Sequence, residues 1–159
     1  MEFAQYIYTS ILPSALSARS AYNTSVLSVK ICRKFGITGR VFTNKQQALT
    51  ITEGPIDIVE HYFQSVGKDP INMKIIPHVQ RLIQAREFEE YSVWLNLGRG
   101  FEFSEYIREL TPQSLQMAWP ATLSPKMRIM ANMYLDPAMA AQPSPIYTRV
   151  EMPLSKAAR

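Results

Sequence analysis

The side chains best suited to metal or nucleophilic chemistry are few in this chain and far apart. It has one cysteine, Cys32, and two histidines, His61 and His78. Their spacing matches no usual zinc site, and one cysteine cannot form an intramolecular disulfide. A single cysteine is also far more often a buried core residue than a nucleophile. The sequence therefore predicts no metal site and no catalytic thiol.

Two other groups of residues lack the context that catalysis needs. Gly98-Arg99-Gly100 has no third glycine and no strand-to-helix setting, so it does not predict a phosphate-binding loop. Glu87, Glu89 and Glu90 lie close in sequence, where strand residues alternate between faces, so they do not converge on one substrate. We expect a protein with no catalytic residues, that is, not an enzyme.

The composition is that of a globular protein whose charges are unevenly distributed. The 159 residues carry a net charge of +4, with 47% hydrophobic and 19% charged residues. No acid occurs between Phe3 and Thr52, whereas most acids fall between Glu53 and Glu109. The basic stretch between Phe3 and Thr52 could contact an acidic partner, although a solvent-exposed helix face is the commoner explanation of such a charge distribution.

The sequence shows no pattern for export or membrane insertion. The N-terminus has Glu2 and no basic region before a long apolar core, and no run of 18 apolar residues occurs. We expect an intracellular, non-secreted protein without a membrane span. Cytoplasmic, ciliary and organellar locations all stay open.

The elements that would position these side chains follow a regular order over residues 1–98. Apolar patterns predict strands at 4–9, 37–43, 47–52, 73–79 and 88–97 and helices at 25–35 and 55–66. Gly36 suits the end of the first helix, and Pro77 indicates a bulge or an edge strand. The order βαββαββ predicts an α+β, ferredoxin-like sandwich with both helices on one face of a mixed sheet.

The chain beyond residue 98 has a different character. Ser104, Thr111-Pro112 and Ser124-Pro125 are typical helix starts, which predicts a helical extension over residues 99–135. Residues 136–159 are rich in proline, alanine and serine, which predicts an extended Pro-rich tail. We expect these helices and this tail to contact other proteins of a multisubunit assembly.

Four short motifs occur in a fixed order with nearly gap-free spacing. They are Tyr8-Thr9-Ser10, Gly36-Ile37-Thr38-Gly39, Leu49-x-x-x-Glu53-Gly54 and Arg86-x-Phe88-x-x-Tyr91-Ser92. Together they resemble the BLUF family of flavin-binding blue-light sensors over about residues 3–97. The resemblance implies a ferredoxin-like fold, and a tyrosine and a glutamine that form a hydrogen-bond network with the flavin.

The resemblance also indicates which residues stand at the flavin-contacting positions. These are Tyr8, Ile31, Cys32, Thr50, Ser65, Tyr91 and Val93. Tyr8 matches the tyrosine, but Thr50 replaces the glutamine and has no amide. Ile31 and Cys32 replace asparagines of the first helix. Since each unpaired polar group of a buried ring costs about 1–3 kcal/mol, these changes predict a site that binds no flavin and no other cofactor.

Three functions remain in competition at the level of the sequence. The favoured hypothesis is a non-enzymatic interaction or structural subunit on a flavin-free BLUF-like scaffold, within a larger assembly such as a ciliary or organellar complex. The first alternative is a blue-light photoreceptor that binds FAD through altered ligands. The second is a nucleic-acid-binding module with Tyr6, Tyr8 and Tyr91 on its sheet, which the missing aromatic-glycine motifs disfavour.

Overall fold

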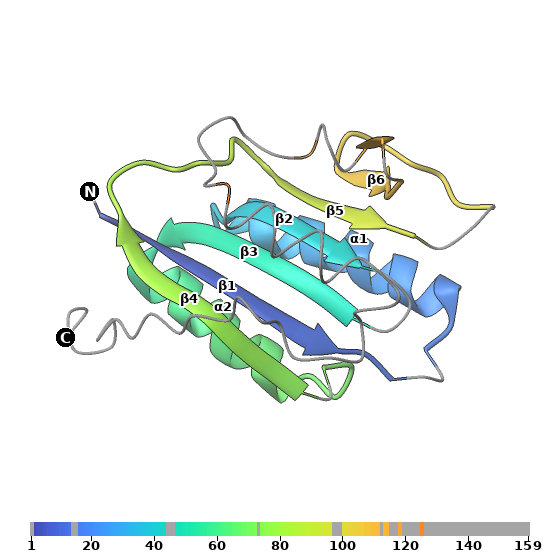
Figure 1. Ribbon diagram of the computed structural model, residues 1–159, viewed down its shortest axis with the longest axis horizontal. Helices are drawn as coiled ribbons and strands as arrows, with labels where there is room; N and C mark the ends of the chain where they lie inside the picture. The colour runs from blue at the N-terminus through green and yellow to red at the C-terminus, as the bar shows by residue number, and fades with distance from the viewer. Residues whose placement is uncertain are drawn as a thin grey trace.

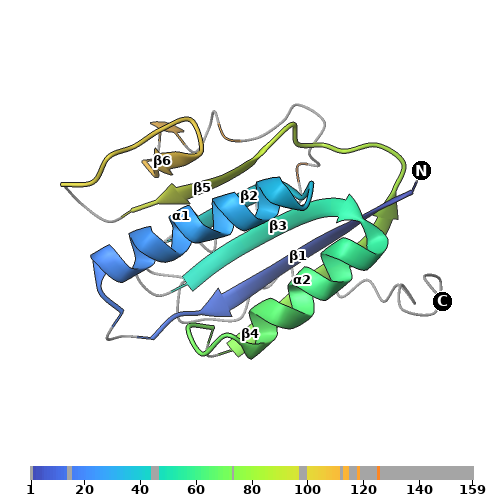
Figure 2. The same cartoon turned by 180° about the vertical axis from the view of Figure 1, so that it is seen from behind.

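A sheet and two helices form two layers, with both helices on the same face of the sheet (Figures 1 and 2). The computed structural model describes residues 2–13, 16–43, 47–72, 74–96, 100–111, 113–114, 118 and 125. The elements are β1 (Phe3–Ile11), α1 (Ala18–Lys34), β2 (Thr38–Thr43), β3 (Gln47–Pro55), α2 (Ile56–Lys68), β4 (Lys74–Ile83), β5 (Tyr91–Leu95) and β6 (Ile107–Glu109). The predicted α+β, ferredoxin-like arrangement is confirmed.

The strands lie in the order β4-β1-β3-β2-β5-β6. β1 pairs antiparallel with β3 and β4, while β5 pairs parallel with β2 and β6. Pro77 lies on β4, at one edge of this sheet, and the register between β1 and β4 shifts between Ile7 and Tyr8. The sequence-based expectation of a bulge or an edge strand at Pro77 is therefore confirmed.

The first helix begins earlier than predicted. α1 starts at Ala18, where the Ser17 hydroxyl caps it by accepting a hydrogen bond from the Ser20 amide at 3.1 Å. Ser25, where the sequence predicts this helix to begin, lies inside the helix and donates to the Ala21 carbonyl. The buried side of α1 is made of small and apolar residues, namely Ala21, Ser25, Val29 and Cys32. Small side chains give a weak apolar signal, which is why the first two turns were missed.

Other element boundaries also differ from the predictions. β3 continues through Pro55, and α2 continues past Gly67 to Lys68. The helix expected to start at Ser104 is instead a turn in which the Ser104 hydroxyl accepts from the Ile107 amide, and β6 follows. Thr111 and Ser114 cap each other reciprocally at the start of a helical turn. Asn44-Lys45, whose residue types suit a tight turn, lies outside the described residues.

The face of the sheet opposite the helices carries a buried polar cluster around Glu53. Its carboxylate accepts hydrogen bonds from Gln5 Nε2 at 2.8 Å and from the amides of Glu87 and Phe88. Arg81 joins Gln5 and Glu87, so the cluster ties the segment before β5 to the sheet. Burial raises the pKa of Glu53, which is fully covered. Glu53 thus fixes where β5 begins, and with it the position of Tyr91.

A buried histidine on β4 makes the stability of the domain depend on pH. His78 is 1% exposed, its Nε2 lies 2.9 Å from the Thr9 hydroxyl, and burial lowers its pKa from 6.5 to about 4. Between pH 6.5 and 4, the His78 side chain is protonated in the unfolded chain but stays neutral in the folded chain. Stability should therefore fall by about 3 kcal/mol between pH 6.5 and 4.

The test is urea unfolding of His78→Gln beside the wild type across that pH range. Glutamine keeps a hydrogen-bonding group but does not titrate, so the variant should lack this slope. Glu53 has a raised pKa and acts in the opposite direction, hence the difference between the two proteins is the informative quantity. Equal slopes in both proteins would contradict the assignment to His78.

Candidate functional site

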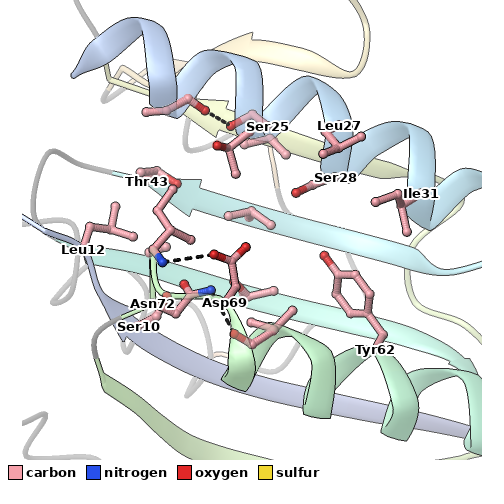
Figure 3. Close-up of a pocket in the computed structure, with 18 of the residues that line it drawn as sticks. Ser10, Leu12, Ser25, Leu27, Ser28, Ile31, Thr43, Tyr62, Asp69 and Asn72 are labelled. Carbon is pink, nitrogen blue, oxygen red and sulfur yellow. Dashed lines mark hydrogen bonds between the residues drawn. The ribbon is translucent and has the colours of Figure 1, made fainter. Parts of the chain in front are cut away.

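A cavity of about 220 Å³ lies between α1 and α2, above the central strands (Figure 3). Side chains from both helices, from β1, β2, β3 and β5, and from the segments that follow β1 and α2 form its lining. These are Tyr8, Ser10, Leu12, Leu16, Ala21, Thr24, Ser25, Leu27, Ser28, Ile31, Val41, Thr43, Ala48, Thr50, Tyr62, Ser65, Val66, Asp69, Ile71, Asn72, Tyr91 and Val93. Residues distant in sequence thus converge on one space.

Two rows of residues across neighbouring strands make the floor of the cavity. The first row, on β1, β3, β2 and β5, is Tyr8, Thr50, Val41 and Val93. The second row is Ser10, Ala48 and Thr43. Alternate strand residues share a face, so both rows point toward the helices. The small side chains of the second row leave room above the sheet.

The walls of the cavity combine apolar side chains with hydroxyl groups. Leu27 and Ile31 on α1 face the gap, as do the hydroxyls of Ser28 on α1 and Tyr62 on α2 (Figure 3). A hydroxyl both donates and accepts hydrogen bonds. The cavity can therefore enclose a flat apolar ring and still pair polar atoms on its edge.

Tyr8 and Thr50 form a hydrogen-bonded pair on the floor. They are direct cross-strand neighbours, and Tyr8 is 2% exposed. Burial raises the pKa of Tyr8 well above 10, an effect that neighbouring Tyr62 and Cys32 reinforce and the Thr50 hydrogen bond partly offsets. The Tyr8 phenol is consequently protonated at any physiological pH and remains a hydrogen-bond donor.

A second hydroxyl network lies beside this pair. Tyr62 hydrogen-bonds with Cys32, Tyr91 and Ser28, and so joins α2 to α1 and to β5. Burial raises the pKa of Cys32 to about 11, although the hydrogen bonds from Tyr62 and Tyr91 lower it. The thiol is therefore held protonated, which does not suit a nucleophile.

The positions that the family resemblance indicated lie together in space. Tyr8, Ile31, Thr50, Ser65, Tyr91 and Val93 all line the cavity. Cys32 is fully buried and contacts the site through Tyr62 and Tyr91.

Sequence reasoning missed the hydroxyls that the helices contribute. Neither Ser28 nor Tyr62 was singled out from the sequence as a site residue, although Tyr62 lies in an apolar stripe with Val59, Phe63 and Val66. A tyrosine in an apolar stripe is a signal in itself, because its buried hydroxyl needs a polar partner.

The family model for BLUF, described as sensors of blue light using FAD, matches residues 3–94. The chain belongs to the BLUF family. The resemblance seen in the four motifs is therefore confirmed. No curated protein sequence matches the chain significantly.

Solved structures of BLUF proteins share the fold. A bacterial light-regulated adenylyl cyclase superposes with a TM-score of 0.53 at 19% identity, over 58% of this chain and 27% of the cyclase. Klebsiella pneumoniae BlrP1 with FMN and cyclic diGMP gives a TM-score of 0.64 at 15% identity, over 90% and 37% of the two chains. The dark state of BlrB, a BLUF protein, gives 0.56 at 18% identity, over 88% and 90%. The chain thus spans about a quarter of the cyclase.

Family membership corrects two predictions made from the sequence. The prediction that no cofactor binds is contradicted, because the family is defined by its use of FAD and because similar structures include one with FMN. The favoured hypothesis of a flavin-free structural subunit is wrong for the same reason, and the photoreceptor alternative fits better. The prediction rested on the missing amide ligands and did not consider the hydroxyls of Ser28 and Tyr62, which also line the cavity.

Within the described ranges, no group of three or more His, Cys, Asp or Glu residues is placed to hold a metal ion. No helix in the same part of the chain is long and apolar enough to cross a membrane.

Proposed function

We propose that this domain binds a flavin between α1 and α2 and responds to blue light without being an enzyme itself. The observation that carries the proposal is the cavity lying directly above the Tyr8–Thr50 pair, in a chain of the BLUF family. The expectation that residues 99–159 contact partner proteins stays a prediction.

The residues present fit a flavin ring. Its imide edge has two carbonyl acceptors and one N–H donor, and the hydroxyls of Thr50, Ser28 and Tyr62 can serve either role. Ile31 and Val66 provide apolar walls for the rest of the ring. A volume of about 220 Å³ is below the 300–1,000 Å³ of most ligand pockets. The cavity therefore suits the ring system, with the flavin side chain outside it.

A bound flavin would supply the absorption of blue light. The protein would supply hydrogen bonds that differ between two arrangements. Tyr8 holds its proton and shares a hydrogen bond with Thr50. Because a hydroxyl rotates freely about its C–O bond, the Thr50 hydroxyl can exchange donor and acceptor roles without moving a heavy atom. The hydrogen bond between Tyr8 and Thr50 is therefore the contact that we expect to rearrange when the flavin ring absorbs light.

Binding is tested by adding riboflavin to the purified full chain and following the quenching of flavin fluorescence. We expect saturation at one flavin per chain, since the cavity above Tyr8 and Thr50 has room for one ring system. Fluorescence that stays unquenched at micromolar protein would contradict the proposed function.

Replacement of Tyr8 by phenylalanine should separate binding from the light response. Phenylalanine keeps the ring that packs edge-on against Phe63 but removes the hydroxyl that shares a hydrogen bond with Thr50. We expect flavin affinity within about tenfold of the wild type, since one hydrogen bond contributes a net ~0.5–1.5 kcal/mol. The shift of the flavin absorption band under blue light should drop several-fold. Tyr6→Phe is the matched control because Tyr6 packs on the same Phe63 and does not line the cavity. A full light response in Tyr8→Phe would exclude Tyr8 as the responding group.

A further inference from the structure

The space between the two helices continues beyond the first cavity. A second cavity of about 530 Å³ is lined by Ile31, Phe35, Ile37, Asp57, Ile58, His61, Tyr62 and Ser65. Ile31, Tyr62 and Ser65 line both cavities. The two therefore form one groove between α1 and α2, divided where Tyr62 of α2 reaches toward Ser28 of α1.

An aspartate lies at each end of this groove. Asp69 lines the first cavity, and Figure 3 places its carboxylate in the gap between the helices. Asp57 and His61 line the second. Among the described residues that line either cavity, none is a lysine or an arginine.

The two helix ends near Asp69 carry partial charges of opposite sign. α2 ends at Lys68, and the negative end of its dipole adds to the Asp69 charge. The positive end of α1 lies near Leu16, which lines the same cavity, but the Ser17 hydroxyl already accepts from the Ser20 amide there. Lys68 carries a positive charge next to Asp69 but lines neither cavity, so among the described lining residues of the first cavity Asp69 is the charged side chain.

We propose that the groove selects a flavin whose side chain carries no phosphate, such as riboflavin, over FMN and FAD. This inference rests on the proposed function. A ring in the first cavity leaves the flavin side chain at one end of the groove, and each end carries an aspartate. A phosphate dianion near a carboxylate is repelled, whereas a ribityl chain has hydroxyls that hydrogen-bond with it.

The expected strength of the repulsion between Asp69 and a flavin phosphate depends on how far water and salt reach Asp69. Asp69 is exposed, so its repulsion of a phosphate acts through water and salt screens it. FMN differs from riboflavin by the phosphate alone. We therefore expect FMN to bind about fivefold to tenfold more weakly than riboflavin at low ionic strength, with the difference shrinking toward about twofold in 0.5 M salt.

The experiment titrates the full chain with riboflavin and with FMN by fluorescence quenching, for the wild type and three variants. Asp69→Asn keeps the oxygen that accepts from the Ile71 amide at 3.0 Å but removes the charge, so it should reduce the difference between the flavins. Asp69→Lys should reverse it. Glu60→Gln removes an acid of α2 that lines neither cavity and should leave the ratio unchanged.

The outcomes separate this inference from the proposed function. Riboflavin binding with FMN equally tight in the wild type would overturn the inference and leave the proposed function standing. The inference would also fail if Asp69→Asn and Asp69→Lys kept the wild-type ratio. Absence of binding by either flavin would contradict the proposed function, and this inference with it.

Discussion

Replacing Gly39 by alanine is expected to destabilise the domain by more than about 4 kcal/mol, a large part of the 5–15 kcal/mol typical of a domain. Gly39 lies on β2 with φ +146°, a backbone conformation that residues with a Cβ rarely adopt. A Cβ there would lie 1.8 Å from the Ile51 carbonyl oxygen on β3. Because that oxygen belongs to a central strand, the sheet itself would have to shift. Gly39 is also the register partner of Tyr91, so the damage would reach the site.

Two other glycines provide the comparison for this prediction. A Cβ at Gly36, where φ is +71°, would meet nothing within 4 Å, so Gly36→Ala should cost only about 1 kcal/mol of backbone strain. Gly67 is helical, and its nearest neighbour would be the Ile75 side chain at 3.9 Å. Gly67→Ala should therefore stabilise the domain by about 0.5–1 kcal/mol. Urea midpoints should rank Gly67→Ala above wild type, then Gly36→Ala, then Gly39→Ala. A Gly39→Ala midpoint close to the wild type would contradict the sheet geometry.

Replacing Ala21 by tryptophan should weaken flavin binding by at least about 100-fold. Ala21 is on α1, is 9% exposed and lines the first cavity. An indole added at this position would occupy space that the ring system needs. Loss of most ring contacts outweighs any single hydrogen bond, because dispersion and apolar burial are summed over the whole ring surface. Flavin fluorescence quenching measures the effect, and circular dichroism shows whether the fold is retained.

Lys30→Trp is the matched control for that substitution. Lys30 is on the same helix, is exposed and lines neither cavity, so the same bulk there should leave flavin affinity unchanged. Tight flavin binding by a folded Ala21→Trp variant would show that the flavin lies elsewhere. The pair of variants thus locates the site independently of the light response.

The order of elements was predictable because their boundaries carry strong local signals. Gly36, with positive φ, marks the end of α1, and Pro77 marks an edge strand with a bulge. The start of α1 was not predictable from apolar periodicity, because its first turns bury Ala21 and Ser25 rather than large side chains. β6 was missed because three residues paired in parallel to β5 depend on distant contacts that a local pattern does not contain.

The candidate site was predictable in position but not in chemistry. Matching motifs indicated Tyr8, Ile31 and Thr50, and these line one cavity. The conclusion that no flavin binds, which rested on the missing amide ligands, is contradicted by the family match. Ser28 and Tyr62 approach the cavity from two helices that are distant in sequence. Which hydroxyls face one space follows from helix placement over the sheet, and no single motif carries that information.

The polar cluster around Glu53, on the other face of the sheet, was also not predictable from a local motif. From the sequence, the pair Glu53-Gly54 was identified only as part of a family motif. In the structure, Glu53 is fully buried and accepts hydrogen bonds from Gln5 and from the amides of Glu87 and Phe88. Its partners lie on β1 and before β5, so the function of this carboxylate depends on tertiary contacts. Burial of such a group is tolerated because it is fully hydrogen-bonded.

The most direct test of the account is a light-minus-dark absorption spectrum of the purified full chain after addition of riboflavin and removal of the excess. We expect a bound flavin spectrum in the dark and a reversible shift of its visible band to longer wavelength under blue light. A protein that retains no flavin, or one whose bound flavin gives the same spectrum before and after illumination, would contradict the proposed blue-light sensor.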